Sequence, residues 1–461
     1  MPVTKPTPEV AADQVVETLK RYILVDGFQL VMDPQASRGA YLHDAVSGRD
    51  YVDFYAFFAS QPVRYNHPGL RDPEFQARLL VAATTKVANA DVYTRSYAQF
   101  VKTVAEVAGL PGLDHLFFID GGALAIENAL KAAFDWKVRK NLAAGRGEIG
   151  QRVIHFRKAF HGRSGYTLSL TNTDPRKTMY FPKFDWPRID NPAIDFLLPE
   201  PRRTEDVAAR EREAIRQIEE ALSRHGHDVA CIITETIQSE GGDNHFRGEF
   251  LRELRRICDQ HELILIFDEV QSGMGITGKM WACQHFDVLP DILCFGKKMQ
   301  QCGLMASRRL DEVDGVFKVP SRINSTWGGN LTDMVRATQI LRIMEGERLV
   351  EKAGQTGAYL LEQLHKLAER HPQISAVRGR GLMCAFDLPT AEIRDRFRRA
   401  CFERQAMVLG CGERTVRFRP VLDIDREDID RGLDVIDEAL VAAADAPPGA
   451  PMPEALSRAE V

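Results

Sequence analysis

The stretch that decides the fold of this chain, residues 263–298, reads LILIFDEVQSGMGITGKMWACQHFDVLPDILCFGKK. Residues 263–267 are all apolar, which predicts a strand buried on both faces of a parallel sheet. That run ends on Asp268, and a second apolar run, residues 292–295, leads into Gly296, Lys297 and Lys298. In open α/β sheets, ligands bind at the carboxyl ends of the strands. We therefore expect Asp268 and a lysine to face one pocket.

Asp268 constrains what that pocket can hold. A carboxylate at the end of a buried strand is unfavourable unless a cation or several hydrogen-bond donors meet it. One interpretation is a buried ion pair with a lysine of the second strand end, since structural pairs also occupy such positions, and spacing alone favours it. The other is a ligand that brings a positively charged atom to Asp268.

The residue order separates these two interpretations. D-E-V-Q, a Gly-rich turn and F-G-K-K together resemble the class III branch, the ω-aminotransferases, of the fold-type-I pyridoxal-phosphate enzymes. The resemblance implies that Asp268 holds the protonated pyridine nitrogen of pyridoxal 5′-phosphate and that Gln271 bonds the ring phenolate oxygen. It also implies that Lys297 bonds to the cofactor and later moves the proton, a role suited to a freed amine beside an electron sink. Lys298 is expected to be solvated or ion-paired.

Length and composition bound the remaining possibilities. A chain of 461 residues can bury a large core and form more than one domain. The formal net charge of −5 creates no basic field for nucleic acid. Because no apolar run approaches the roughly 18 residues of a membrane span and the N-terminus has no signal-peptide core, we expect a cytoplasmic protein without a membrane partner. The eight cysteines are dispersed, which predicts reduced thiols and no metal site.

A Gly-rich turn upstream is a candidate anion site. Residues 117–129 read FFIDGGALAIENA, which predicts a short strand, a Gly pair and a helix. The free amides at a helix N-terminus bind anions, although most such turns only satisfy backbone geometry. In the resembled family this element is the phosphate cup, so Gly122 and Ala123 are the expected contacts. Many relatives have Ser at the second position, where this chain offers only a backbone amide.

The segment K-A-F-H-G-R-S, residues 158–164, carries two further candidates. The resemblance implies that Phe160 stacks on the pyridine ring, in keeping with the offset stacking of aromatic systems. Family members that act on the terminal amine of an amino acid have an arginine at the position of Arg163, which binds the distal carboxylate through two parallel hydrogen bonds. An arginine in a surface turn is the alternative.

Two acids and one arginine complete the candidate substrate pocket. The family reads E-P-I-Q-G-E-G where this chain has E-T-I-Q-S-E-G, so Thr236 and Ser239 leave the backbone path of the loop open. Glu235 is expected to support the cofactor pocket, and Glu240 stands at the position of a glutamate that changes its partner between half-reactions. Arg417, in V-R-F-R-P, matches the arginine that binds a second substrate carboxylate.

The motif N-S-T-W-G-G-N, residues 324–330, resembles the family's S-T-x-G-G-N element. In the family the threonine, here Thr326, reaches the cofactor phosphate and substrate region of the neighbouring subunit. The resemblance therefore implies a homodimer with shared active sites. A plain Thr-containing turn is the alternative.

The resemblance predicts an α/β, fold-type-I architecture with a mostly parallel seven-stranded sheet in a large domain. A smaller α+β domain is expected to combine both ends of the chain. Its N-terminal part would contain a helix that begins near Pro8 with Val15, Leu19 and Ile23 on its apolar face, followed by a hairpin. The expected divisions are residues 1–65 for the N-terminal segment, 66–330 for the large domain, 331–445 for the C-terminal part, and 446–461 for a disordered tail.

Three longer motifs point to one substrate. G-G-A-L-A-x-E-N-A-L-K-A-A-F-D-W-K, H-G-R-S-G-Y-T-L-S-L-T-N-T and F-P-K-F-D-W-P-R-I are similar to the subgroup that acts on L-lysine. This similarity implies transfer of the lysine ε-amino group to 2-oxoglutarate, which gives L-glutamate and 2-aminoadipate 6-semialdehyde, a product that cyclises to piperideine-6-carboxylate. The alternatives are an ω-aminotransferase for ornithine, 4-aminobutyrate or another diamine, a pyridoxal-phosphate mutase or decarboxylase, and a cofactor-free binding module.

Overall fold

The computed structural model describes residues 9–445, and its centre is a seven-stranded mixed sheet. The strand order is β3-β11-β10-β9-β6-β4-β5, and only β11 runs antiparallel to its neighbours. The predicted mostly parallel sheet is thus confirmed. Its strands are β3 (His115–Phe118), β4 (Arg152–Phe156), β5 (Arg188–Ile189), β6 (Val229–Glu235), β9 (Ile264–Asp268), β10 (Ile292–Phe295) and β11 (Gly303–Ala306).

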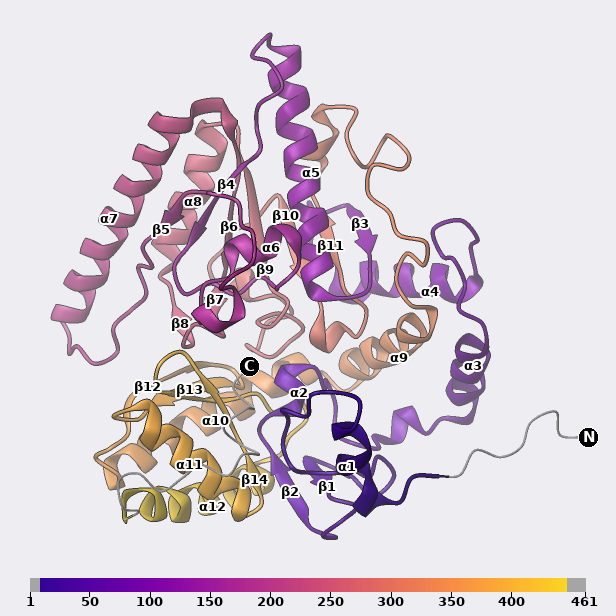
Figure 1. The fold of residues 1–461 in the computed structure, drawn as a ribbon, viewed down its shortest axis with the longest axis vertical. Helices are drawn as coiled ribbons and strands as arrows, with labels where there is room; N and C mark the ends of the chain where they lie inside the picture. Colours follow the sequence, from indigo (N-terminus) through magenta and orange to yellow (C-terminus); the bar gives the residue numbers. More distant parts are fainter. Residues whose placement is uncertain (1–8, 446–461) are drawn as a thin grey trace, which may run out of the picture.

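Both faces of the sheet are covered, which explains the continuous apolar run of β9. Ile264 and Ile266 pack in one hydrophobic cluster with α5 (Gly122–Ala143), whereas Leu265 and Phe267 pack in another with α8 (Gly248–Gln260). Successive side chains of a strand point to opposite faces, so this alternation places the two helices on opposite sides. Figure 1 shows α5 and α8 along the sheet, with α7 (Arg202–His225) beyond β5 at its edge.

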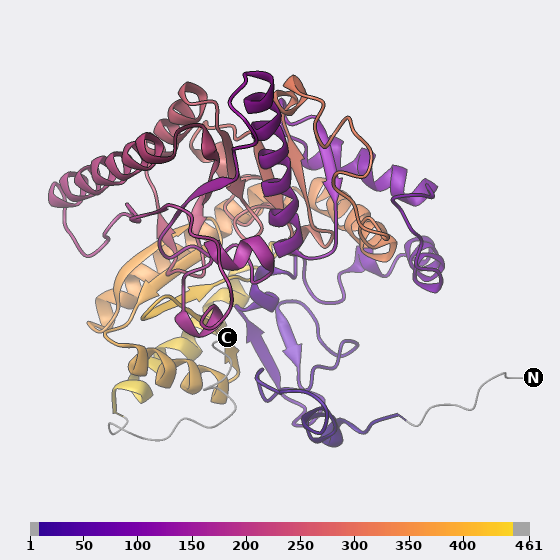
Figure 2. The same cartoon turned by 45° about the horizontal axis from the view of Figure 1, so that its top comes forward.

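The two ends of the chain share one sheet. In it, β2 (Asp50–Asp53) pairs antiparallel with β1 (Tyr41–His43), which confirms the expected hairpin, and parallel with β14 (Ala406–Met407). A four-stranded antiparallel sheet has the order β12 (Ser375–Arg380), β13 (Met383–Asp387), β16 (Thr415–Phe418) and β15 (Leu409–Cys411). Figures 1 and 2 show these sheets below the large one. The divisions at residues 65 and 330 stay predictions.

Helices and short pairings complete the fold. α9 (Leu331–Gly346) packs on α3 (Pro73–Thr84) and α4 (Arg95–Thr103), and α11 (Ala391–Glu403) packs on α12 (Arg426–Asp445). β7 (Ile237–Gln238) and β8 (Asn244–His245) form a separate two-stranded sheet. Two further helices are α6 (Gly165–Leu170) and α10 (Leu349–Arg370). Within residues 9–445, no helix is both long and apolar enough to cross a bilayer.

The predicted N-terminal helix is shorter than expected. α1 spans only Val15–Lys20 and contains no buried residue. Because the helix ends before Ile23, that residue cannot extend its apolar face, and both Leu19 and Ile23 are exposed. The expectation that Val15, Leu19 and Ile23 form one apolar face of the helix is therefore wrong. The expected start at Pro8 and the expected disordered tail, residues 446–461, lie outside the described residues.

α2 (Ala56–Ala59) is a single turn of left-handed backbone. Its four residues have φ between 41° and 69°, although none is glycine. Left-handed geometry costs roughly 1–2 kcal/mol per residue with a Cβ. The buried Asp53 carboxylate offsets part of that strain: Oδ1 accepts hydrogen bonds from the amides of Tyr55 and Ala56, and Oδ2 accepts one from the Tyr65 hydroxyl. Hydrogen bonds to Asp53 thus stabilise the left-handed turn.

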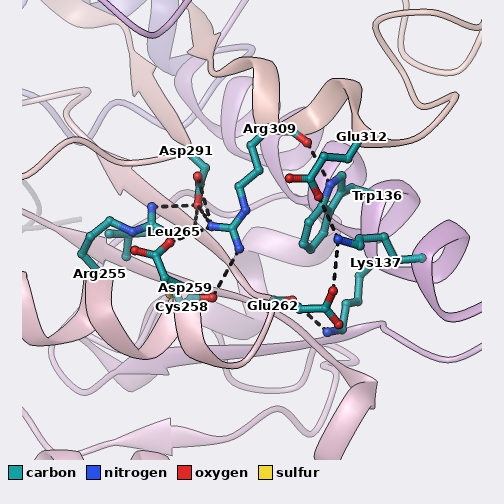
Figure 3. Close-up of polar contacts among 11 residues, drawn as sticks. Trp136, Lys137, Arg255, Cys258, Asp259, Glu262, Leu265, Asp291, Arg309 and Glu312 are labelled. Atoms are coloured by element: carbon teal, nitrogen blue, oxygen red, sulfur yellow. Dashed lines mark hydrogen bonds and ion pairs between the residues drawn. The ribbon is translucent and has the colours of Figure 1, made fainter. Parts of the chain in front are cut away.

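A polar network lies at the amino ends of the central strands (Figure 3). Asp268 lies at the opposite, carboxyl end of β9. Asp291, just before β10, accepts hydrogen bonds from the Leu265 amide and the Arg255 guanidinium, each at 2.8 Å. Arg309 also contacts Asp291, at 3.3 Å. Lys137 donates to the carbonyl of Glu262 at 2.8 Å, and burial lowers the pKa of this lysine to about 8. These contacts fix α5 and α8 to the base of the sheet.

Candidate active site

A cavity of about 660 Å³ lies at the carboxyl ends of β6 and β9. Nine of the candidate residues line it, whereas Thr326 and Arg417 do not. Phe58, Ser60, His161 and Lys177 also line it without having been assigned a role from the sequence. The nine are Gly122, Ala123, Phe160, Arg163, Glu235, Glu240, Asp268, Gln271 and Lys297.

Asp268 is held by strand register and by a histidine. Parallel pairing of β9 places Asp268 beside Glu235 of β6 and Cys294 of β10. Its Oδ2 lies 2.8 Å from His161 Nδ1, and its Oδ1 accepts a hydrogen bond from the Val270 amide at 3.0 Å. Among the described residues its ion-pair partner is His161, so the interpretation of a structural pair with a lysine is wrong. Asp268 is 6% exposed.

Lys297 follows β10 and begins a short 3-10 helix, η7 (Lys297–Met299), with φ of 47°. Within residues 9–445, its Nζ has no hydrogen-bond or ion-pair partner, and the residue lines the cavity. Burial, reinforced by the Arg417 guanidinium, lowers the pKa of Lys297. A buried amine biased toward its neutral form is a nucleophile.

Lys298 does not line the cavity, and the expectation that it would be solvated or ion-paired is wrong. It is 2% exposed, and its Nζ donates to the Ala59 carbonyl of the left-handed turn at 2.9 Å. Burial lowers the pKa of Lys298 to about 7. Gln300 Nε2 donates to the next carbonyl, that of Ser60, at 2.8 Å. The lysine loop and α2 are therefore joined at two successive carbonyls.

Gln271 is oriented by two arginines. Its Oε1 accepts hydrogen bonds from Arg419 Nε at 3.0 Å and from Arg417 Nη1 at 3.4 Å. A guanidinium only donates, so the amide oxygen must face the arginines. The Nε2 amide then remains as a donor for a ligand in the cavity.

The N-terminus of α5 forms one wall. Gly121, with φ of 97°, precedes the helix, and Gly122 and Ala123 line the cavity. The first amides of a helix have no intrahelical acceptor and attract anions. The loop of residues 160–163 packs directly on this wall, because a Cβ on Gly162 would lie 2.5 Å from the Ala123 Cβ.

Glu235 connects two loops of the site. Its Oε1 accepts a hydrogen bond from the Phe160 amide and its Oε2 one from the Ser239 amide, each at 3.0 Å. Burial raises the pKa of Glu235 to about 7. Ser239, one of the two departures from the family motif, thus keeps a backbone amide aimed at this carboxyl group. The other, Thr236, contacts the Ser272 hydroxyl at 3.1 Å.

Glu240 stands between two cations. Its Oε2 lies 2.6 Å from Arg417 Nη2, and its Oε1 lies 2.8 Å from Lys177 Nζ. The two cations hold the pKa of Glu240 at about 2 against the opposing effect of burial. Arg417 borders a second cavity of about 320 Å³, which shares Phe58, Lys177 and Glu240 with the first. Lys177 was missed because it lies 63 residues from Glu240 in a segment that matches no motif.

Arg163 and Thr326 are both exposed but differ in position. Arg163 lines the first cavity, and no hydrogen bond or ion pair engages it within residues 9–445. Thr326 lies in a loop outside both cavities of this chain. The structure thus brings together every candidate residue except Thr326.

The comparisons with known proteins agree with this geometry. Residues 23–440 match the family described as Aminotransferase class-III. The chain belongs to the class III aminotransferases.

Proteins named lysine aminotransferases are similar to this class III aminotransferase over nearly their whole length. It is 54% identical to the L-lysine-epsilon aminotransferase of Mycobacterium tuberculosis, over 93% of this chain and 95% of that protein. It is 48% identical to that of Amycolatopsis lactamdurans, over 96% and 99%. The solved structure of lysine aminotransferase from M. tuberculosis in the internal aldimine form superposes with a TM-score of 0.92, at 53% identity, covering 94% of this chain and all of that one.

The site of this class III aminotransferase fits the family's cofactor, pyridoxal 5′-phosphate. The cavity offers the buried Asp268 carboxylate for a cationic ring nitrogen and the Nε2 donor of Gln271 for an anionic ring oxygen. Lys297 supplies an amine biased toward its neutral form, and the N-terminus of α5 supplies amides for a phosphate. His161 was missed because the segment K-A-F-H-G-R-S was interpreted only for Phe160 and Arg163, and Phe58 was missed because no motif pointed to it.

Proposed function

We propose that this enzyme transfers the ε-amino group of L-lysine to 2-oxoglutarate, giving L-glutamate and 2-aminoadipate 6-semialdehyde. The observation that carries the proposal is the arrangement of two arginines: Arg163 is exposed in the cavity, whereas Arg417 is covered by Glu240. The names of the similar proteins from M. tuberculosis and A. lactamdurans support the choice of lysine.

In the lysine half-reaction, Arg163 binds the α-carboxylate at the far end of the substrate. Glu240 remains paired with Arg417, so that this arginine neither repels the diamine nor attracts its carboxylate to the wrong place. A guanidinium binds a carboxylate through two parallel hydrogen bonds and so fixes which end of the molecule it holds. The ε-amine then reaches the region of Lys297.

In the acceptor half-reaction, 2-oxoglutarate presents a carboxylate at each end. Its side-chain carboxylate takes Arg163, and its α-carboxylate displaces Glu240 and binds Arg417. The keto carbon then reaches the same place that the ε-carbon of lysine occupied. One site can thus accept both L-lysine, with an amine at the reacting end, and 2-oxoglutarate, with a carboxylate at each end, because Glu240 changes its contact with Arg417.

The chemistry at the centre of the site is assigned to the residues that face it. Pyridoxal 5′-phosphate, when bound, supplies an electron sink that stabilises negative charge at the carbon bearing the amino group. Asp268, oriented by His161, would hold the charge on the ring nitrogen, and Gln271 would donate to the ring oxygen. Phe160 would provide an aromatic wall for the ring. The Lys297 Nζ would take the proton from the substrate carbon that bears the amino group, and the amides of Gly122 and Ala123 would hold the phosphate.

The homodimer also belongs to this proposal. Thr326 is exposed, and the neighbouring Trp327 is 48% exposed although Lys86 lies 3.5 Å above its ring centroid. Such a loop is available to reach the cofactor phosphate of a partner subunit. Sedimentation of the holoenzyme should give the mass of a dimer. Thr326→Ala should weaken the binding of pyridoxal 5′-phosphate, because the contact to its phosphate is lost. The cytoplasmic location stays a prediction.

Product identification tests the function directly. The holoenzyme is incubated with L-lysine and 2-oxoglutarate, and mass spectrometry follows glutamate and the cyclised semialdehyde. Ornithine and 4-aminobutyrate serve as competing donors, each tested alone and then with lysine. Faster glutamate formation from either competitor than from lysine would identify that competitor as the preferred amino donor. Absence of glutamate with every donor would contradict transamination to 2-oxoglutarate.

A further inference from the structure

The string Lys177–Glu240–Arg417 contains one anion and two cations. Each oxygen of Glu240 contacts a different cation, at 2.8 Å for Lys177 and 2.6 Å for Arg417. Both cationic side chains are nearly inaccessible, at 5% and 1% exposure. The charges of these three side chains therefore sum to +1 in the resting structure, and one further carboxylate would bring that sum to zero.

We propose that Lys177 holds the Glu240 carboxylate after the acceptor displaces it from Arg417, and so acts as a positioning residue for the acceptor half-reaction. This inference rests on the proposed function, in which Glu240 changes its contact with Arg417. When the α-carboxylate of the acceptor binds Arg417, the string becomes two neutral pairs, Lys177 with Glu240 and Arg417 with substrate. The acceptor thus supplies the missing anion.

Lys177 is positioned to do this without moving. It ends a short 3-10 helix, η4 (Pro175–Lys177), whose first turn is capped by the Asp174 carboxylate. Its Nζ lies 5.4 Å from the centroid of the Phe160 ring, a favourable location for a cation. The lysine is therefore anchored on a wall of the same cavity that the substrate enters.

Space for the displaced carboxylate is also present. Phe58, Lys177 and Glu240 line both the cavity of about 660 Å³ and the neighbouring one of about 320 Å³. Arg417 borders only the second. Glu240 can consequently turn away from Arg417 within the shared wall and keep its contact with Lys177.

Loss of Lys177 should affect the two half-reactions unequally. With Lys177 removed, Glu240 and Arg417 still form a neutral pair, so the state that accepts L-lysine is preserved. In the acceptor-bound state, however, the Glu240 carboxylate would have lost both of the cations that it contacts in the structure, in a largely buried place, which is unfavourable. The penalty therefore falls on the state in which the acceptor occupies Arg417.

The test compares Lys177→Met with Lys183→Met, a matched substitution in the same segment whose Nζ donates to the Thr178 and Phe181 carbonyls instead. Single-turnover spectra of the holoenzyme separate the two half-reactions. For Lys177→Met we expect the apparent affinity for 2-oxoglutarate to fall about 10- to 100-fold, the effect of losing a hydrogen bond to a charged group. The lysine half-reaction should change by less than about threefold, which is small on the same scale.

Two further measurements exclude a merely structural role. Calorimetric binding of glutarate, an unreactive dicarboxylate, should weaken in Lys177→Met, whereas binding of valerate, which has one carboxylate for Arg163, should not. Lys177→Arg should restore glutarate affinity. In a Glu240→Gln background, Lys177→Met should have little additional effect because no charge remains to be held.

The outcomes separate this inference from the proposed function. If the wild-type enzyme forms no glutamate from lysine, the proposed function fails, and glutarate binding still tests the contact. If wild-type activity is as proposed but Lys177→Met damages both half-reactions equally, leaves glutarate affinity unchanged or raises it, Lys177 does not hold the displaced carboxylate.

Discussion

Replacement of Arg417 by methionine should separate the two half-reactions. In the lysine half, Arg417 contacts Glu240 and not the substrate, so its loss removes no substrate contact. Lys177 remains 2.8 Å from Glu240, and the two charges then sum to zero. The variant should therefore keep most of the lysine half-reaction. In the acceptor half, the same change removes the partner of the α-carboxylate.

The magnitude follows from the exchange of partners. Removing one member of a buried, hydrogen-bonded charge pair typically costs about 2–5 kcal/mol. The wild-type enzyme must first break the 2.6 Å contact between Arg417 and Glu240, so its net gain lies at the lower end of that range. A loss of about 2–3 kcal/mol corresponds to a roughly 30- to 150-fold weaker affinity for 2-oxoglutarate.

Stopped-flow spectra of the cofactor, recorded with lysine alone and with 2-oxoglutarate alone, measure each half. Arg414→Met is the matched control, because Arg414 lies just before β16 and borders neither cavity. Arg163→Ala should damage both halves, since both substrates use Arg163. Equal losses in both halves for Arg417→Met, or an acceptor loss below about threefold, which falls under the expected range, would refute the exchange of partners at Arg417.

Three further predictions concern the centre of the site. Lys297→Ala should abolish transamination and the cofactor's visible absorbance band. Lys298→Met should keep the band with reduced turnover, because it loses only the hydrogen bond that supports α2. The reverse pattern in spectra and assays would show that the roles of the two lysines are assigned wrongly. Asp268→Asn should bind cofactor but lose most turnover, since an amide cannot hold the ring charge, and near-normal turnover would remove that role. The pKa of Lys298 falls from 10.5 to about 7 on folding, so the unfolded chain binds this proton more readily, and the contribution of Lys298 makes the free energy of unfolding rise between pH 7 and 10.5. The urea midpoint should therefore rise less from pH 7 to pH 9 in Lys298→Met than in the wild-type enzyme. An equal rise in both proteins would contradict the burial of this amine.

The chemistry of the strand ends could be read from the sequence because strands impose simple rules. An uninterrupted apolar run of five residues, 263–267, is too short for a buried helix and fits a strand that is buried on both faces. Once β9 and β10 are parallel neighbours, Asp268 and Lys297 must emerge at the same edge. β11 was missed because its four residues, G-L-M-A, follow the lysine turn too closely to form a distinct pattern.

The contacts that tune the site could not be read in the same way. Lys177 meets Glu240 across 63 residues, and His161 meets Asp268 across 107. Neither contact follows from local periodicity, because each depends on how a loop returns to the sheet edge. The twin lysines illustrate the same limit: sequence places both after β10, but only the backbone decides which one enters the cavity.

Two segments with left-handed backbone geometry determine which of the two lysines enters the cavity. Lys297 and Gln300 have φ of 47° and 65°, and they face the left-handed turn Ala56–Ala59. Such conformations persist only where surrounding contacts enforce them, and they concentrate at functional sites. Here the enforcing contacts are the hydrogen bonds from Lys298 to the Ala59 carbonyl and from Gln300 to the Ser60 carbonyl. Because the Lys298 Nζ is bonded to α2, the strained turn directs Lys297 into the cavity, and the same bridge holds Phe58 in the cavity wall.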